Sequence, residues 1–193
     1  MPCELVSLAV MLLIFGVPLL WLIGTYNGLV RLRQHLRESW AGIDTELKRR
    51  YDLIPNLVET VKGYAAHERR VLEEVIAARQ QAVNSTGSPA AQARDENALV
   101  GSLRQLFAVS EAYPDLKASA HFLALQKELA NTEDRISAAR RFYNANVRDL
   151  NTRIAQFPSN IVAGLFNFRE AEYFEIEEVG MRAAPVVNLG ATV

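Results

Sequence analysis

The sequence predicts an all-α protein in which a single N-terminal transmembrane helix continues into an elongated antiparallel four-helix bundle. Two observations carry this prediction: a long uncharged apolar run near the N-terminus, and apolar residues that recur at steps of three and four through most of the remaining chain. A third is that the 193 residues include only 10 glycines and 7 prolines, too few for an all-β protein with many tight turns. We divide the chain into an anchor (1–25), a bundle (26–157) and a partly irregular C-terminal extension (158–193).

The apolar run predicts the anchor. Residues 5–24 carry no charged side chain. A helix of this length is about 30 Å long, the thickness of the hydrocarbon core of a bilayer. A cleaved signal peptide is the alternative, but no Lys or Arg precedes the run and no A-x-A-like cleavage site follows it. We therefore expect a retained anchor in the cell membrane.

Basic residues lie on only one side of this run. None precedes it, whereas Arg31, Arg33 and Arg37 follow it closely. Since Lys and Arg are enriched on the cytoplasmic side of membrane proteins, we expect a single-pass protein with its N-terminus outside and its bundle in the cytoplasm.

Four amphipathic segments follow the anchor. The first carries apolar residues at helical spacing from Leu29 to Leu47, so we expect the anchor helix to continue to about Arg50. The segment 52–55 (Asp-Leu-Ile-Pro) predicts a turn, because Asp caps helices and Pro fits a first helical turn. A second helix is expected over 57–82, a loop over 84–89, and a third helix over 99–109.

The fourth segment has the strongest periodicity. Apolar residues recur at intervals of seven, and a companion set gives a 3-4-3-4 rhythm that predicts a coiled-coil-like seam about 60 Å long. The first set is Phe122, Leu129, Ile136, Tyr143, Leu150 and Phe157, and the companions are Leu125, Thr132, Ala139 and Asn146. The polar Thr132 and Asn146 are explained by control of helix register, by partial exposure or by a ligand-lined interior.

The composition excludes several functional classes. With 21 Lys and Arg against 22 Asp and Glu, the chain is not a strongly basic nucleic-acid binder. Its one cysteine, Cys3, excludes an intramolecular disulfide framework and a cysteine-based zinc site. Three scattered histidines show no metal-ligand spacing, and there is no phosphate-binding, dinucleotide-binding or nucleophile-elbow motif. We expect no catalytic residue, no metal and no cofactor, and therefore no enzyme.

Several local strings are nevertheless specific. They are Lys-Arg-Arg-Tyr-Asp-Leu-Ile-Pro-Asn-Leu at 48–57, Glu-Ala-Tyr-Pro-Asp-Leu-Lys at 111–117 and Phe-Pro-Ser-Asn at 157–160. In this order after one N-terminal span, the chain resembles the LemA family of bacterial membrane proteins from about residue 5 to 168. The resemblance implies an anchor in the bacterial cytoplasmic membrane, an elongated antiparallel four-helix bundle and no established catalytic activity. The family includes a branch tied to magnetosome formation and members encoded near membrane proteases of the HtpX type.

The two predicted turns, at 52–55 and at 113–115, would lie together at the membrane-distal end of an up-and-down bundle. Helix capping explains these residues in the simplest way, but Tyr and Arg are also enriched at protein interfaces. A docking surface there would comprise Arg49, Arg50, Tyr51, Asp52, Pro55, Asn56, Tyr113 and Asp115.

Two functional classes follow. The first is a noncatalytic, membrane-anchored scaffold or adaptor with the lipid bilayer and a protein as partners. That protein is either a second copy of the chain or an HtpX-type membrane protease. The second class is an extracytoplasmic sensor whose helical bundle binds a ligand.

Overall fold

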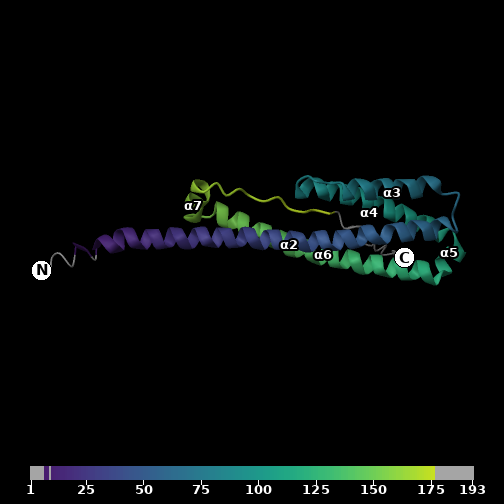
Figure 1. Cartoon of the computed structure of the whole chain (residues 1–193), viewed down its shortest axis with the longest axis horizontal. Coiled ribbons are helices and arrows are strands. Elements are labelled where there is room, and N and C mark those ends of the chain that lie inside the picture. The colour runs from purple at the N-terminus through teal and green to yellow at the C-terminus, as the bar shows by residue number, and fades with distance from the viewer. Residues whose placement is uncertain (1–6, 9, 177–193) are drawn as a thin grey trace, which may run out of the picture.

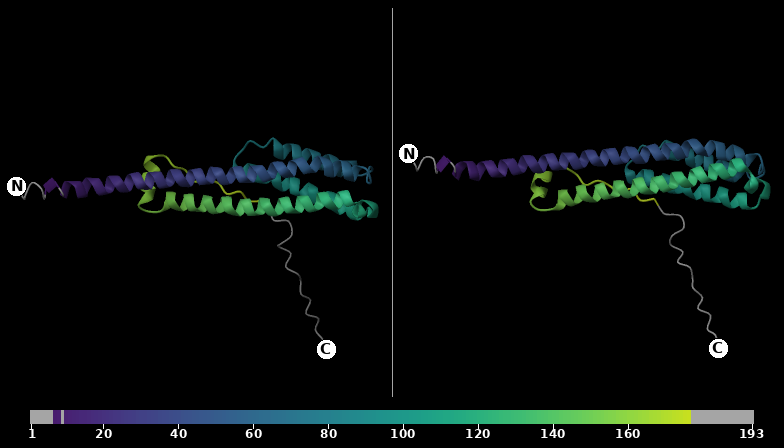
Figure 2. Two further views of the ribbon diagram at one scale, coloured as in Figure 1. Left: turned by 60° about the horizontal axis from the view of Figure 1, so that its bottom comes forward. Right: turned by 90° about the horizontal axis from the view of Figure 1, so that it is seen from below.

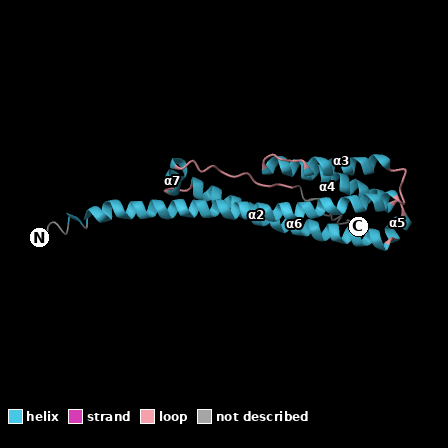
Figure 3. Cartoon of the chain, viewed as in Figure 1, coloured by secondary structure: helices cyan, strands magenta, loops and turns pink. Residues whose placement is uncertain are grey.

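The computed structural model describes residues 7–8 and 10–176, which form an elongated all-helical molecule (Figures 1 and 3). Apart from loops and an extended segment at the C-terminal end, these residues are helical, and the all-α prediction is confirmed for them. In chain order the elements are η1 (Leu12–Gly16, a π-helical segment), α2 (Val17–Lys62), α3 (Arg69–Val83), α4 (Pro89–Glu111), α5 (Pro114–Ala118), α6 (Ala120–Ala155) and α7 (Ser159–Leu165).

The N-terminal part of α2 and the preceding η1 stand clear of the other helices (Figure 1). Their large apolar side chains are exposed, including Leu13, Phe15 and Leu20 at 64%, 68% and 71%. Leu12–Lys62 is long and apolar enough to cross a membrane, with a mean hydropathy of 1.7 in its most apolar window. The predicted N-terminal apolar helix is thus confirmed, and most of its large apolar side chains are exposed.

The predicted end of the first helix near Arg50 is wrong. Helix α2 continues through Pro55 to Lys62, and the connection to α3 is made by residues 63–68 instead. Pro lacks an N–H and normally breaks a helix interior, because the carbonyl four residues earlier loses its donor. Here that carbonyl belongs to Tyr51, and Arg79 of α3 donates to it from Nε at 2.7 Å. A contact from the neighbouring helix therefore replaces the hydrogen bond that Pro55 removes.

Helices α2 and α6 form a long antiparallel pair (Figures 1 and 2). The ring of Trp40 lies 5.2 Å from that of Tyr143, while farther along α2 Arg50 reaches Glu133, which comes earlier in α6. The predicted heptad seam is confirmed from Phe122 to Leu150, whose five members are all buried. The prediction is wrong for its last member, since α6 ends at Ala155 and Phe157 is 75% exposed.

The α3–α4 hairpin packs beside this pair only over the half remote from the N-terminus (Figure 2). Its helices have 15 and 23 residues, against 46 and 36 in α2 and α6. Ser88 ends the loop between them and caps α4, its hydroxyl accepting from the N–H of Ala91 at 3.4 Å. Four helices thus lie together over part of the length, and a four-helix bundle over all of 26–157 is not confirmed.

The other half of the α2–α6 pair is covered by the segment after α6. Helix α7 turns back and buries Val162 and Ala163 against Leu29 and Leu150. Asn167, with φ of 54°, then closes α7 with the pair of backbone hydrogen bonds typical of a left-handed helix cap. Residues 168–176 run back along α6 in an extended conformation (Figure 1). The expected irregular extension is therefore partly a structural layer; residues 177–193 lie outside the described part.

Two asparagines of α6 hold this extended segment by its backbone. The side-chain amide of Asn151 exchanges two hydrogen bonds with the backbone of Ala171, at 2.8 and 2.9 Å. Asn144 exchanges two with Phe174, both at 3.0 Å. Phe174 is fully buried and its ring lies 5.2 Å from Trp40 in an edge-on arrangement. Paired amide hydrogen bonds and one buried ring thus fix a non-helical segment on a helix.

We call the packed elements from Thr25 of α2 to residue 176 the helical body. Its distal end comprises residues 63–68 and 111–119, and its proximal end comprises α7 with the neighbouring ends of α2 and α6.

The packing of the α6 seam gives a first prediction. Ile136 and Leu150 are 2% and 3% exposed, in the two separate clusters of buried apolar residues. Replacing either by Ala should lower the free energy of unfolding by about 2–5 kcal/mol, because it leaves a cavity. Denaturant unfolding of the full chain in detergent, followed by circular dichroism, measures this. Phe142→Ala, at a residue 63% exposed on the same helix, is the control, and equal stability of all three variants would contradict the buried seam.

Candidate functional site

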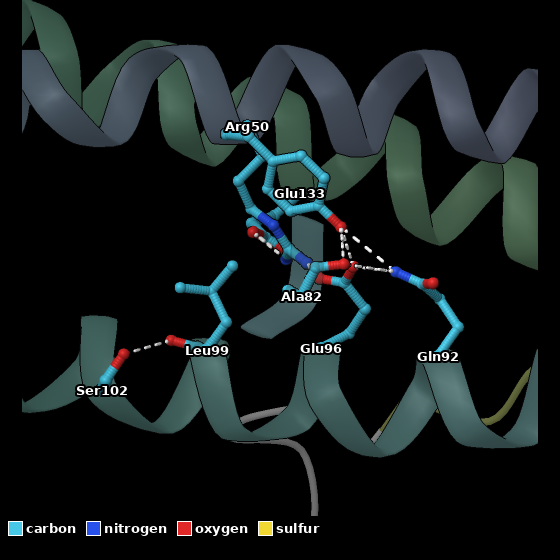
Figure 4. A network of polar contacts seen from close by, with 8 residues as sticks. Arg50, Ala82, Gln92, Glu96, Leu99, Ser102 and Glu133 are labelled. Carbon is cyan, nitrogen blue, oxygen red and sulfur yellow. Dashed lines mark hydrogen bonds and ion pairs between the residues drawn. The ribbon is translucent and has the colours of Figure 1, made fainter. Parts of the chain in front are cut away.

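A buried network of polar side chains connects the four longest helices of the body (Figure 4). Its centre is Arg50 of α2, which is fully buried. One terminal nitrogen of Arg50 donates to Glu133 Oε1 of α6 at 2.7 Å, and the other pairs with the carboxylate of Glu96 of α4. Glu96 is also fully buried, whereas the Glu133 side chain is 42% exposed. A cation inside the body is therefore held between two carboxylates from different helices.

Two more side chains complete the shell of Glu96. The hydroxyl of Tyr51 donates to Glu96 Oε1, and Gln92 Nε2 donates to the same oxygen at 2.8 Å. Gln92 Nε2 also lies 3.2 Å from the carbonyl oxygen of Ala82, at the end of α3. The carboxylate of Glu96 thus accepts hydrogen bonds from α2 and from its own helix, and Gln92 also connects this cluster to α3.

The network fixes its own protonation. Burial by itself would lower the pKa of Arg50, but the negative charges of Glu133 and Glu96 outweigh it and raise that pKa. Burial, together with the hydrogen bond to Glu96, raises the pKa of Tyr51 far above its ordinary value. Arg50 therefore remains a cation and Tyr51 a neutral donor. These are the properties of a clamp between helices, not of a group that exchanges protons.

A groove opens between α4 and α6 next to this network. Its volume is about 790 Å³, and Glu133 contributes to both the groove and the network. Apolar side chains including Leu103, Phe107 and Leu129 line it, with charged Arg104 beside them. Residues at its other side are Asp134, Arg140, Arg141 and Ile176, the last residue described. The groove has the size and mixed lining of a ligand or peptide site.

The residues expected at a docking surface do not come together. Arg50 and Tyr51 lie inside the body, 0% and 7% exposed. The exposed side chains in the C-terminal third of α2 include those of Arg49, Asp52, Pro55 and Asn56, whereas Asp115 is exposed and Tyr113 half-buried at the distal end. The expectation placed all eight at the end because it assigned a turn to 52–55, which is helical.

The distal end is instead made by residues 63–68 meeting the start of α5. The hydroxyl of Tyr113 donates to Glu68 Oε1 at 3.2 Å. Tyr64 in the same turn is 48% exposed, and Asp115 is exposed nearby. We call Tyr64, Tyr113 and Asp115 the distal surface.

Sequence reasoning missed Glu96, Glu133 and Gln92, although a signal was available. Buried positions on α2 recur as Ile43, Leu47, Arg50, Ile54 and Leu57, so Arg50 occupies a position on the apolar face. In α4, Glu96 holds a similar position among Ala93, Leu99 and Leu103. Opposite charges on the apolar faces of two helices indicate a buried ion pair, because an isolated buried charge is too costly.

The described residues do not place three or more His, Cys, Asp or Glu side chains together as metal ligands. The contacts within the network are hydrogen bonds and charge pairs among its own members.

The network gives a second prediction. Glu96→Leu should destabilise the protein by about 3–5 kcal/mol, because it leaves Arg50 buried with only a half-exposed partner. Adding Arg50→Met should recover much of this loss, since the uncompensated charge is then gone. Denaturant unfolding of the single and double variants in detergent measures the coupling. Glu59→Leu, which breaks an exposed pair with Lys62, serves as control, and additive effects of the two core substitutions would contradict the assigned pairing.

Comparison with known proteins shows which family this architecture represents. The chain is 28% identical over 172 residues to Protein LemA of Metamycoplasma hominis, covering 86% of this chain and 77% of that protein. It is 26% identical over 180 residues to Magnetosome protein MamQ 2 of Paramagnetospirillum magneticum, and 24% to Magnetosome protein MamQ of Magnetospirillum gryphiswaldense. Each of these two matches covers 80% of this chain and 66% of the magnetosome protein. The LemA family matches residues 39–189, and the chain belongs to the LemA family.

Proposed function

We propose that this protein is a noncatalytic, membrane-anchored scaffold that presents a protein-docking surface at a distance from the bilayer. The observation that carries the proposal is the continuity of α2, which runs from the exposed apolar segment through the whole helical body. At about 1.5 Å per residue, Lys62 lies about 57 Å along the helix from Gly24. A single rod thus connects the membrane to the distal end.

The interior of the body supports a structural role. The buried cation and its partners tie α2 to α4 and α6, and the pKa values of Arg50 and Tyr51 are raised, so both side chains remain protonated donors. The asparagine contacts of α6 hold the extended segment in the same way, by pairing with its backbone. In the distal half this arrangement acts as a four-helix bundle whose seam is coiled-coil-like. Such a body holds its distal end at a fixed distance and orientation from the anchor.

The distal surface is the docking site we favour. Tyr64 and Tyr113 present aromatic rings at the tip of the body, beside the carboxylate of Asp115. Aromatic side chains are enriched at protein interfaces because they bury a large area at a small cost in side-chain entropy. The partner would be a second copy of the chain or a membrane protease of the HtpX type, as the family resemblance implies. The names of the magnetosome relatives support a membrane-associated role but do not identify this partner.

The orientation belongs to the same proposal. Arg31, Arg33 and Arg37 follow the apolar segment and all three are exposed on α2, so the positive-inside rule places the body in the cytoplasm with one crossing of the membrane.

A second candidate function is favoured by the groove between α4 and α6. A volume of about 790 Å³ with apolar walls and both basic and acidic side chains at its sides would suit an amphipathic ligand. In that case the body would lie outside the cytoplasm and the protein would be a ligand sensor.

Topology gives a third prediction and separates the two candidates. A fluorescent protein fused after Val193 should be bright, and alkaline phosphatase fused at the same place should be inactive, because phosphatase folds only outside the cytoplasm. Both reporters are measured in intact cells and normalised to the amount of fusion protein. The reverse result would place the body outside and favour the sensor.

Partner capture gives a fourth prediction. Tyr64→Ala and Tyr113→Ala should each weaken capture of the protein partner from mildly crosslinked, detergent-solubilised membranes. A buried interface aromatic is worth about 2 kcal/mol, which corresponds to about a thirtyfold change in Kd. Capture is quantified by mass spectrometry against the unmodified chain, with circular dichroism to show that the helices persist.

The matched controls are Tyr173→Ala, at a tyrosine 41% exposed on the extended segment, and Arg69→Ala at the start of α3. Both should capture as the unmodified chain does. Unchanged capture by both distal variants would contradict the docking proposal, as would turnover of a substrate by the purified protein that one substitution abolishes. A charge reversal at Arg50 is unsuitable for this test, because it would disrupt the core.

A further inference from the structure

Helix α7 is apolar on both of its faces. Val162 and Ala163 are buried against α2 and α6, whereas Ile161 and Leu165, four residues apart on the opposite face, are 59% and 69% exposed. Phe157, just before α7, is 75% exposed. Adjacent exposed apolar residues of this size on a soluble surface mark an interaction site.

The position of α7 identifies what lies against this face. It forms the proximal end of the helical body, beside the point where α2 leaves the body and becomes exposed and apolar (Figures 1 and 2). The ring of Phe166 lies 4.7 Å from that of Tyr26, only two residues beyond the end of the apolar run at Gly24. The partly exposed apolar surface around α7 is therefore continuous with the apolar surface of the anchor, which includes Trp21 and Ile23.

Basic residues outnumber acidic ones at the proximal end. Residues 20–35 and 150–169 contain the arginines Arg31, Arg33, Arg153 and Arg169 and no Asp or Glu, while Asp149 and Glu170 directly adjoin the second range. The guanidinium of Arg33 lies 5.0 Å from the ring centre of Phe168, whose ring lies 5.9 Å from Tyr26. Aromatic rings and arginines beside an apolar surface are typical of the bilayer interface, where the rings sit at headgroup level and the cations meet anionic lipid.

We propose that α7 and Phe157 form a second membrane contact, which lies in the interface of an anionic bilayer next to the point where α2 enters it. The inference rests on α2 being the anchor and is independent of the scaffold role. A contact of this kind is a short monotopic insertion, because seven residues cannot span the hydrocarbon core. With it, the body is held against the bilayer at two places instead of one.

Spin labels on the full chain test this contact. In a Cys3→Ser background, single cysteines at Phe157, Ile161 and Leu165 are labelled and reconstituted into vesicles of phosphatidylcholine and phosphatidylglycerol. Collision of each label with oxygen, which partitions into lipid, and with a water-soluble nickel chelate reports its depth. Phe142→Cys, on an apolar residue equally exposed but remote from the proximal end, is the matched control, and Leu20→Cys marks the anchor.

We expect the ratio of oxygen to nickel collisions at 157, 161 and 165 to be several-fold higher than at 142 and to approach that at 20. An Ile161→Asp, Leu165→Asp pair should return the ratio at 157 toward the control while circular dichroism remains unchanged. Ratios at 161 and 165 equal to that at 142 would overturn the contact. So would protection from both reagents, which indicates burial against protein such as a second copy. A water-exposed label at 20 would also overturn it, together with the anchor.

Discussion

The pairing of Arg50 with Glu96 is the interaction on which the arrangement of the helices depends. Both side chains are fully buried, so neither charge can be compensated by water. Each therefore requires the other, and this requirement fixes α4 in register and in distance from α2. Glu133, whose side chain is 42% exposed, adds a weaker constraint of the same kind for α6. Apolar packing alone tolerates helices that slide by a turn, whereas a buried ion pair with defined hydrogen bonds permits one register.

Pro55 contributes to the same set of contacts between helices. By removing its own N–H it frees the carbonyl of Tyr51, and Arg79 from α3 occupies that carbonyl. The adjacent residues Arg50 and Tyr51 thus contact α4 and α6 through their side chains, and Tyr51 contacts α3 through its backbone. Within the string at 48–57, the adjacent residues Arg50 and Tyr51 therefore contact all three neighbouring helices, α3, α4 and α6.

The helical character, the apolar anchor segment, the α3–α4 loop and the α6 seam were predictable, because each leaves a periodic or compositional signal in the local sequence. The continuation of α2 through Pro55 was not, because the local preference of proline opposes it. Tertiary packing keeps this segment helical, because Ile54, Leu57 and Val61 continue the buried stripe of Ile43 and Leu47 past the proline. The network was partly predictable, since Arg50 falls on that stripe. Its partners on α4 and α6 are 46 and 83 residues away, and only the fold selects them.

The continuity of α2 also makes the molecule a lever. A hydrophobic segment that does not match the local bilayer thickness tilts, and a helix without a hinge transmits that tilt undiminished. For a rod of about 57 Å, a rotation of about 10° at the membrane moves the far tip sideways by about 10 Å. A tilt of the apolar segment in the bilayer would therefore displace the tip, a mechanical coupling that a flexible linker between anchor and body would abolish.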